Sequence, residues 1–424
     1  MPRGKRGGNH GNRGCNHGNR NGDYHRGDPR AQRSGEPEVF YSPELCLALP
    51  KLSAARQQEI ARQEGREDEP HVIDGSMLEG GGQILRISAA LSCLTTKQVT
   101  VTKIRACRPK PGLSAQHLAG LRLVAAICEG ELVGGAIRSE EIVLTPGLVR
   151  AGKYSVDTKT AGSVSLLLQT ALPCALFAAE PSTLVLKGGT NADFAPPIEY
   201  FTHVFSHYAA MFGVRYETEV VRRGYFPRGG GEVVVEVNPL ASLQPVTLLE
   251  RGGPVSATVS VLGSTGKRCL HPTVALLLRR FGGLKITTEV LDESSTEGWG
   301  LTILLKTSTK CLLAASAVGS PKASPERLAA DTAERLIKDF DEGACCDCYM
   351  QDQVIILAAL ASGTSRIRTG PLTLHTKTAI HVCETLTGAR FTVTKEENGN
   401  LGEQSLVIEC QGVGHCNPYD LGDK

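Results

Sequence analysis

The feature that most constrains the fold of this chain is an internal duplication. Residues 71–144 and 154–237 follow the same predicted order of strand, helix, strand, helix and two further strands, and the copies begin 83 residues apart. β-Branched and apolar runs predict the strands, and apolar residues at helical spacing predict the helices. Because each such unit must bury one face of its elements, the duplication predicts an α/β (α+β) fold built from repeated β-α-β-α-β-β units.

A third copy can be completed if an insertion is allowed. Its first strand is predicted at 257–262 and its first helix at 348–360, with the remaining elements farther on. The intervening residues 265–341 alternate between helix and strand patterns, which predicts a small inserted α/β domain. The main domain would then comprise residues 69–264 and 342–418, with three repeats.

The N-terminal residues have a different composition. Residues 1–37 are rich in Gly, Arg and Asn, and are predicted to be disordered, whereas 38–68 are predicted to form a charged helical connector. Residues 1–35 carry eight basic and two acidic side chains, a net charge of +6, and the remaining chain carries −4. The tail is either a solvated arm or a segment for non-specific RNA binding or nuclear targeting. The folded part must meet any anionic partner through local clusters of basic side chains.

The composition also argues against several classes of protein. No stretch of 18 or more apolar residues is present, so we expect no transmembrane helix, and the N-terminus lacks the apolar core of a secretory signal. The 14 cysteines are scattered along predicted helices and strands, where we expect them to be reduced and buried. Only 5% of residues are aromatic, so base stacking is not expected to dominate binding. The sequence predicts a soluble intracellular protein.

A glycine-rich turn provides the first candidate site. Glu79 precedes three glycines, Gly80–Gly82, and the helix that follows carries Arg86 one turn from its start. Glycines allow the backbone to approach a ligand closely, and the N–H groups of a helix N-terminus favour phosphate. The Gly-Lys-Ser/Thr ending of a Walker A loop is missing. Glu79 is a hard oxygen ligand suited to Mg²⁺ beside phosphates, while a simple structural turn is the alternative.

Basic residues accompany this turn. Arg105 and Arg108 lie at the end of the next predicted strand, followed by Lys110. Guanidinium groups bind phosphate oxygens in bidentate fashion, so the cluster suits a polyphosphate. The alternative is a solvated basic loop.

A second candidate lies in the turn Gly370–Thr376. It places His375 at or just before a helix N-terminus, where the helix dipole disfavours the imidazolium form and leaves a neutral nucleophile. His381 lies within the same helix and is expected to pack structurally. Neither His203 with His207 nor the cysteines at 345–348 have the spacing of a zinc site.

Taken together, these segments resemble the RNA 3′-terminal phosphate cyclase family. The resemblance runs from about residue 69 to residue 418, and position 107 departs from it, because a cysteine stands where the family commonly has glycine. The matching segments are 74–76, Glu79–Arg86, 105–113, Gln116-His117, 188–191, 195–197, 228–231, Asp352-Gln353 and the turn with His375.

The resemblance implies a fold and an activity. The family is described as three repeats that resemble the C-terminal domain of translation initiation factor 3, with a small inserted domain. Its members convert an RNA 3′-phosphate into a 2′,3′-cyclic phosphate with ATP and Mg²⁺ or Mn²⁺, releasing AMP and pyrophosphate through histidine–AMP and RNA–adenylate intermediates. The resemblance and the basic tail predict residence in the nucleus (nucleoplasm), with the cytoplasm as an additional location. The expected partner is an RNA with a 3′-terminal phosphate, and no association with a membrane is expected.

The resemblance also assigns roles to residues of this chain. His375 would be the nucleophile, Glu79 would place the metal ion, and the arginines of the two loops would hold phosphate oxygens. The residues implied in catalysis or in nucleotide binding are His375, Arg86, Arg105 and Arg108, and then Gln169, Pro196, Tyr349, Asp352 and Gln353.

Two other functions compete with this one. A cyclase-like branch binds RNA in ribosome assembly without adenylation, and it lacks the histidine nucleophile. An enolpyruvyl transferase shares the repeat unit but needs a larger set of repeats. Because His375, Glu79 and Arg86 are all present, the sequence favours the enzyme.

Overall fold

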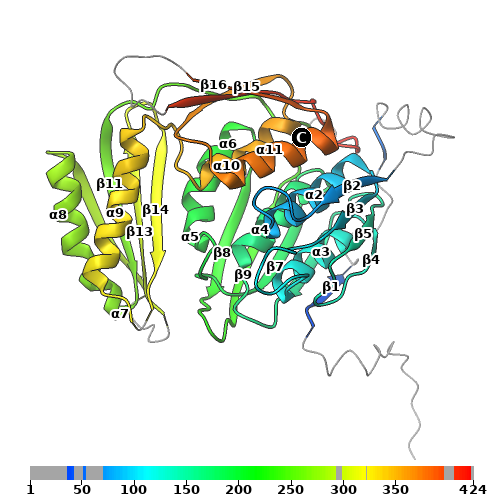
Figure 1. The fold of residues 1–424 in the computed structure, drawn as a ribbon, viewed down its shortest axis with the longest axis horizontal. Coiled ribbons are helices and arrows are strands. Elements are labelled where there is room, and N and C mark those ends of the chain that lie inside the picture. Colours follow the sequence, from blue (N-terminus) through cyan, green and yellow to red (C-terminus); the bar gives the residue numbers. More distant parts are fainter. Residues whose placement is uncertain are drawn as a thin grey trace, which may run out of the picture. The chain divides into compact units, whose positions relative to one another are not determined.

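The computed structural model describes residues 36–42, 51–53, 70–292, 298–320, 322–395 and 405–421. The predicted disordered tail up to residue 35, and most of the predicted connector, lie outside these residues. In the part of the chain that is described, no helix is long and apolar enough to cross a membrane. The architecture is a mixed α/β fold with several mixed sheets (Figure 1), as the sequence predicts for the fold class.

Three of the sheets share one strand order. In each, the first strand pairs in parallel with the second, and the fourth strand pairs antiparallel with both the second and the third. Their strands are β2 (His71–Asp74), β3 (Val99–Thr102), β4 (Glu131–Val133) and β5 (Ile142–Thr145); β6 (Lys153–Asp157), β7 (Ser182–Gly188), β8 (Tyr216–Arg222) and β9 (Gly231–Val237); and β10 (Thr247–Leu248), β15 (Thr364–Thr369), β16 (Arg390–Lys395) and β17 (Leu406–Gln411).

Helices that belong to different sheets pack against one another. Helix α2 contacts α3, α4 and α11, and α10 contacts α11, so the apolar faces of helices from all three sheets join in one core. The bounds of the helices are α2 (Gly82–Thr95), α3 (Ala115–Ile127), α4 (Val164–Ala175), α10 (Met350–Leu360) and α11 (Leu374–Thr387), with a continuous helical stretch of α5 (Ile198–Tyr200), a π-helical segment (Phe201–Phe205) and α6 (Ser206–Met211).

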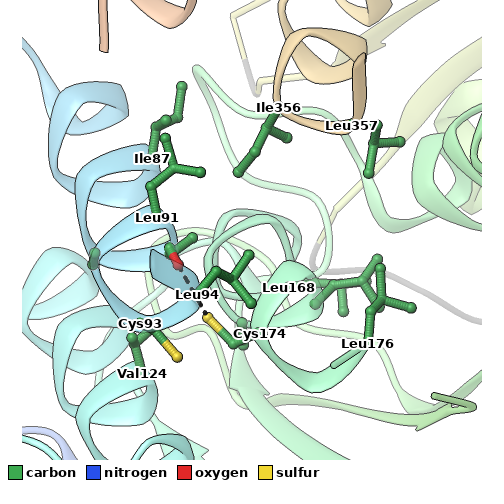
Figure 2. Packing of buried hydrophobic residues seen from close by; sticks show 14 of the residues in the cluster. Ile87, Leu91, Cys93, Leu94, Val124, Leu168, Cys174, Leu176, Ile356 and Leu357 are labelled. Carbon is green, nitrogen blue, oxygen red and sulfur yellow. Dashed lines mark hydrogen bonds between the residues drawn. The ribbon is translucent and has the colours of Figure 1, made fainter. Parts of the chain in front are cut away.

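Figure 2 shows the centre of this core. Ile87 and Leu91 of α2 face Ile356 of α10, and Leu168 of α4 belongs to the same buried apolar cluster. The Cys174 thiol lies 3.9 Å from the carbonyl oxygen of Ala90 and is buried as a small apolar group. Because burying each such side chain contributes about 1.5–3 kcal/mol, this layer holds the helices, and the residues at their N-termini, in fixed relative positions.

The inserted unit has a sheet and a hydrophobic core of its own. Its strand order is β12-β11-β13-β14, with helices α8 and α9 packed against each other, and the unit occupies one side of Figure 1. Its elements are β11 (Pro254–Leu262), α7 (Gly263–Gly266), a 3₁₀ turn (Lys267–Cys269), α8 (Leu270–Arg280), β12 (Lys285–Asp292), β13 (Gly300–Thr307), β14 (Leu312–Val318) and α9 (Pro325–Asp341).

The prediction from the sequence was wrong for one strand of this insert, β11. Residues 257–262 were predicted to begin the third repeat, but they belong to β11, which pairs with β12 and β13. The first strand of the third sheet is instead the two-residue β10, which precedes the insert and pairs with β15. Strand β10 is too short to show an alternating apolar pattern in the sequence. The longer strand β11, which follows it and does alternate, was therefore predicted as the first strand of the third repeat.

The start of the predicted helical connector is also wrong. Residues Glu38–Ser42 form strand β1, which pairs antiparallel with β6 at the edge of the second sheet. The ring of Tyr41 stacks on that of Tyr154 at 4.9 Å between centroids. The run of Val39, Phe40 and Tyr41 has high β propensity, and the exposed edge of β6 offers it hydrogen bonds.

A buried carboxylate ties the insert to the main body. Both oxygens of Asp347 accept hydrogen bonds, from the hydroxyl of Tyr200 at 2.6 Å, from the backbone N–H groups of Tyr349 and Met350, and from that of Ala314 in β14 at 3.0 Å. Asp347 is fully buried, and burial raises its pKa to about 7. The cluster fixes the start of α10 against the insert.

We therefore expect Asp347→Asn to lower the free energy of unfolding by about 2–3 kcal/mol, because one amide N–H₂ group would face a buried donor. Urea denaturation followed by circular dichroism measures the change. The matched control is Asp341→Asn, whose exposed ion pair with Arg280 is worth less than about 1 kcal/mol. Equal losses in the two variants would contradict this assignment.

Candidate active site

The glycine-rich turn at the start of α2 brings two functional side chains together, those of Glu79 and His117. Gly80 has a φ of +59°, in the left-handed region that favours glycine. A Cβ at Gly81 would collide with the carboxylate of Glu79, and one at Gly82 would lie 2.3 Å from Nε2 of His117. The glycines therefore leave room for a carboxylate and an imidazole beside the helix N-terminus.

Glu79 forms an ion pair at this turn. Its Oε1 contacts the guanidinium of Arg108, which also donates to the Glu79 carbonyl oxygen at 2.9 Å. Its Oε2 is buried and has no hydrogen-bond partner among the described residues. The Glu79 backbone N–H donates to Oγ1 of Thr378 in α11 at 3.2 Å, which joins the turn to the helix that carries His375. One carboxylate oxygen is thus left for a further donor or cation.

Arg86 lies one turn into α2, as predicted, and its guanidinium is largely buried. Its Nε donates to Oε1 of Gln169 in α4 at 2.8 Å. Burial lowers its pKa to about 10, and the carboxylates of Asp352 and Glu79 oppose that shift. Because this pKa stays well above 7, Arg86 is a buried cation that can bind an anion.

His375 occupies the second position of α11. Thr373 caps the helix, its hydroxyl accepting from the N–H of Thr376 at 3.0 Å. The buried amide of Gln351 holds the preceding turn, because its Oε1 accepts from the N–H of Thr373 at 2.8 Å and from the hydroxyl of Thr376 at 2.6 Å. The backbone that presents His375 is therefore fixed from both sides.

A chain of hydrogen bonds sets the tautomer of His375. Nε2 of Gln83 donates to Oδ2 of Asp352 at 2.6 Å, and Oε1 of Gln83 lies 2.8 Å from Nδ1 of His375. When Asp352 is ionised, its carboxylate can only accept, so the amide group of Gln83 turns its N–H₂ toward Asp352 and its oxygen toward the histidine. Nδ1 then carries the proton, and Nε2 of His375 keeps its lone pair.

Electrostatics keep this histidine neutral. Partial burial is the main cause that lowers the pKa of His375, the cations Arg86 and Arg108 lower it further, and Glu79 opposes them. Burial also raises the pKa of Asp352 to about 7, against the effect of Arg86. A lowered pKa means that the imidazole is unprotonated at neutral pH, which the position at a helix N-terminus also predicts.

A cavity of about 430 Å³ joins most of the predicted residues. All five side chains expected around a nucleotide line it, together with Arg86 and His375, and the insert contributes part of its wall. The lining relevant to these predictions is Arg86, Gln169, Pro196, Tyr349, Asp352, Gln353 and His375, with Phe194 from the loop before α5 and Ser316 and Arg335 from the insert.

The other predicted arginines lie beside the cavity and do not line it. Arg108 holds Glu79, and Arg105 donates to the carbonyl oxygen of Gly112 at 2.8 Å from a left-handed backbone conformation. Burial and the charge of Arg108 lower the pKa of Arg105. Cys107 does not adopt the left-handed conformation, so its backbone at this position does not require glycine.

The sequence missed several residues of this site. Gln83 and Gln351 position His375, and Arg335 of α9 donates to the hydroxyl of Tyr349 at 2.9 Å and to the carbonyl oxygen of Ser316 at 2.8 Å. Gln83 and Gln351 could have been identified from the sequence as polar residues within otherwise apolar helices. Nothing in the sequence placed Arg335 here, because it comes from a separate folding unit.

We predict that His375 titrates below its ordinary pKa of 6.5 and carries its proton on Nδ1 when neutral. Histidine side-chain ¹H–¹⁵N spectra over a pH series measure both, with the resonance assigned by its loss in His375→Ala. Glu79→Gln should lower this pKa further, because it removes the carboxylate that stabilises imidazolium. Arg86→Gln should raise it. Shifts of the opposite sign would contradict the arrangement.

Comparisons with known proteins agree with the resemblance seen in the sequence. The sequence pattern of RNA 3′-terminal phosphate cyclase matches residues 77–393. A protein of Dictyostelium discoideum named probable RNA 3′-terminal phosphate cyclase is 38% identical over 380 residues, covering 85% of this chain and 87% of that protein. The RNA 3′-terminal phosphate cyclase of Drosophila melanogaster is 38% identical, covering 81% and 97%, and that of Nitrosospira multiformis is 40% identical, covering 76% and 93%. The chain therefore belongs to the RNA 3′-terminal phosphate cyclase family.

Proposed function

We propose that this protein is an ATP-dependent RNA 3′-terminal phosphate cyclase that works through a covalent histidine–AMP intermediate. The observation that carries the proposal is the hydrogen-bonded chain Asp352–Gln83–His375 at the edge of the cavity. It leaves Nε2 of a neutral imidazole available for attack, beside a buried cation and a turn suited to phosphate.

The first step forms a bond between Nε2 of His375 and the α-phosphorus of ATP. The bond from that phosphorus to the bridging oxygen of the β-phosphate breaks, and pyrophosphate leaves. Arg86 neutralises charge on the phosphate, and Arg105 and Arg108 stand close by to bind further oxygens. The neutral imidazole needs no base to remove a proton before it attacks.

The residues present fit a divalent cation. The described residues contain no group of three or more acidic, His or Cys side chains that would form a protein cage. Mg²⁺ instead is commonly held by one or two carboxylates together with substrate phosphates, and the unpaired Oε2 of Glu79 is such a ligand. The ion, Mg²⁺ or Mn²⁺, would shield the charge of the triphosphate.

AMP then passes to the 3′-phosphate of RNA, which breaks the P–N bond to His375 and forms a phosphoanhydride. The neighbouring 2′-hydroxyl attacks the RNA phosphorus and expels AMP, leaving a 2′,3′-cyclic phosphate. Because the hydroxyl is tethered beside its target, orientation supplies much of the acceleration. The substrate is held at one terminal phosphate by a few arginines, which is compatible with the net charge of −4 outside residues 1–35.

We infer further that the three sheets with one strand order are three copies of a unit like the C-terminal domain of translation initiation factor 3. The alternative function, RNA binding in ribosome assembly without catalysis, is disfavoured by the retained His375 and its positioning partners. We also propose RNA binding by residues 1–37, from their basic composition, and a nuclear location, from the same tail and the family.

The decisive test is incubation with ATP labelled at the α-phosphate, in the absence of RNA. We expect an acid-labile, base-stable protein–AMP adduct in the wild type and in His381→Ala, and none in His375→Ala. His381 is the matched control because it lies on the same helix, away from the cavity. A folded wild type without an adduct, or an adduct that persists in His375→Ala, would refute the proposal.

Gln353 is predicted to favour adenine. Its Nε2 donates to the carbonyl oxygen of Tyr349 at 2.7 Å, which leaves a buried Oε1 with no partner among the described residues. This acceptor suits the exocyclic amine of adenine and repels the corresponding carbonyl of guanine. Gln353→Met should weaken ATP binding about tenfold, equivalent to about 1.4 kcal/mol, and should strengthen GTP binding, because the repulsion of the guanine carbonyl is removed. Nucleotide titration measures both, and equal losses for the two nucleotides would contradict this role.

A further inference from the structure

Two phenylalanine side chains are exposed to solvent, and one of them, Phe194, lines the cavity. Phe194 is 105% exposed and Phe226 is 72% exposed, although only 5% of the residues of the chain are aromatic. Phe194 also has a φ of +60°, which is uncommon for a bulky residue and costs conformational energy. Strained backbone of this kind clusters at active sites and ligand clamps, and here it presents an apolar ring to water.

The loops that carry these rings are joined. The backbone N–H of Thr190 donates to the carbonyl oxygen of Gly224 at 2.9 Å, and Asn191 forms a β-bridge with Tyr225. Tyr225 points inward, since it is 5% exposed and its ring lies where a Cβ at Gly298 would be. The next residue, Phe226, therefore faces outward from an anchored turn. We call Phe194 and Phe226 with their two loops the aromatic lip.

The lip borders the proposed reaction site. Phe194 itself lines the cavity that contains His375, two residues before Pro196. If the terminal phosphate of an RNA lies near His375, the nucleotides that precede it extend out of the cavity along its wall. Phe194 forms part of that wall.

Cationic side chains accompany the rings. Arg228 lies two residues beyond Phe226 and is exposed. Arg222, at the end of β8, has a side chain that is 65% exposed, donates to the carbonyl oxygen of Gly230 at 2.7 Å and lies 3.8 Å from Glu232. Rings beside guanidinium groups match a single strand of nucleic acid, in which bases alternate with phosphates.

We propose that the aromatic lip stacks the bases next to the 3′-terminal phosphate of single-stranded RNA, with Arg222 and Arg228 contacting its backbone phosphates. This inference rests on the proposed function. Because every base has a π face, such a platform accepts RNA ends of different sequence. It also gives affinity to a folded region whose net charge is negative, where general electrostatic attraction is weak.

The test is binding of a fluorescent RNA oligonucleotide with a 3′-phosphate to the full chain, followed by anisotropy. Phe226→Ala should raise Kd at least about tenfold, and Phe226→Trp should restore it, because an indole ring can stack on a base and a methyl group cannot. The control is Phe40→Ala, which removes a ring that is 62% exposed on β1 and does not line the cavity. Arg228→Gln should flatten the dependence of log Kd on log salt by about 0.7.

The RNA-free adduct assay separates failure of this inference from failure of the proposed function. Phe226 does not line the cavity, so Phe226→Ala should form the protein–AMP adduct as the wild type does. Ribose 3-phosphate, which has the terminal phosphate but no base to stack, should bind the variant and the wild type equally. Unchanged RNA affinity in Phe226→Ala, or an equal loss of affinity in Phe40→Ala, would refute base stacking by the aromatic lip. Neither result would bear on the proposed adenylation of His375. Loss of the adduct in the wild type would overturn the chemistry instead.

Discussion

The two-sided hydrogen bonding of the Gln83 amide is the interaction on which the site depends. Gln83 donates to Asp352, 269 residues away, and faces Nδ1 of His375, 292 residues away. A carboxamide has one donor end and one acceptor end, so satisfying Asp352 decides what is offered to the histidine. Because Gln83, Asp352 and His375 come from α2, α10 and α11, the packing of these three helices determines the tautomer of His375.

That geometry persists because the helices have little freedom. Helices α2, α4, α10 and α11 share one apolar core, and their N-terminal halves contribute Arg86, Gln169, Asp352 and His375. The insert is part of the same arrangement, since Asp347 accepts from Ala314 and Arg335 donates to Tyr349. Close packing in such cores has low compressibility, so the polar groups at the helix ends keep their relative positions.

Much of the secondary structure followed from local pattern. The helices at α2, α10 and α11 have apolar residues at helical spacing, and they start within a few residues of where the sequence places them. The failures concern β1 and β10. A five-residue edge strand and a two-residue strand form only because a neighbouring strand offers free hydrogen-bonding groups, and local sequence carries no record of that neighbour.

The sequence by itself determined which chemical groups the protein has and the local backbone that presents them. Glycines before α2 and a capped turn before His375 are local features, because they depend on residues only a few positions apart. The tertiary structure alone decided how these groups act on one another. The lone pair on Nε2 of His375, the unpaired oxygen of Glu79 and the place of Arg335 in the cavity wall arise from contacts between distant segments. Hydrogen-bond direction and burial depend on neighbours in space, so they exist only once the chain has folded.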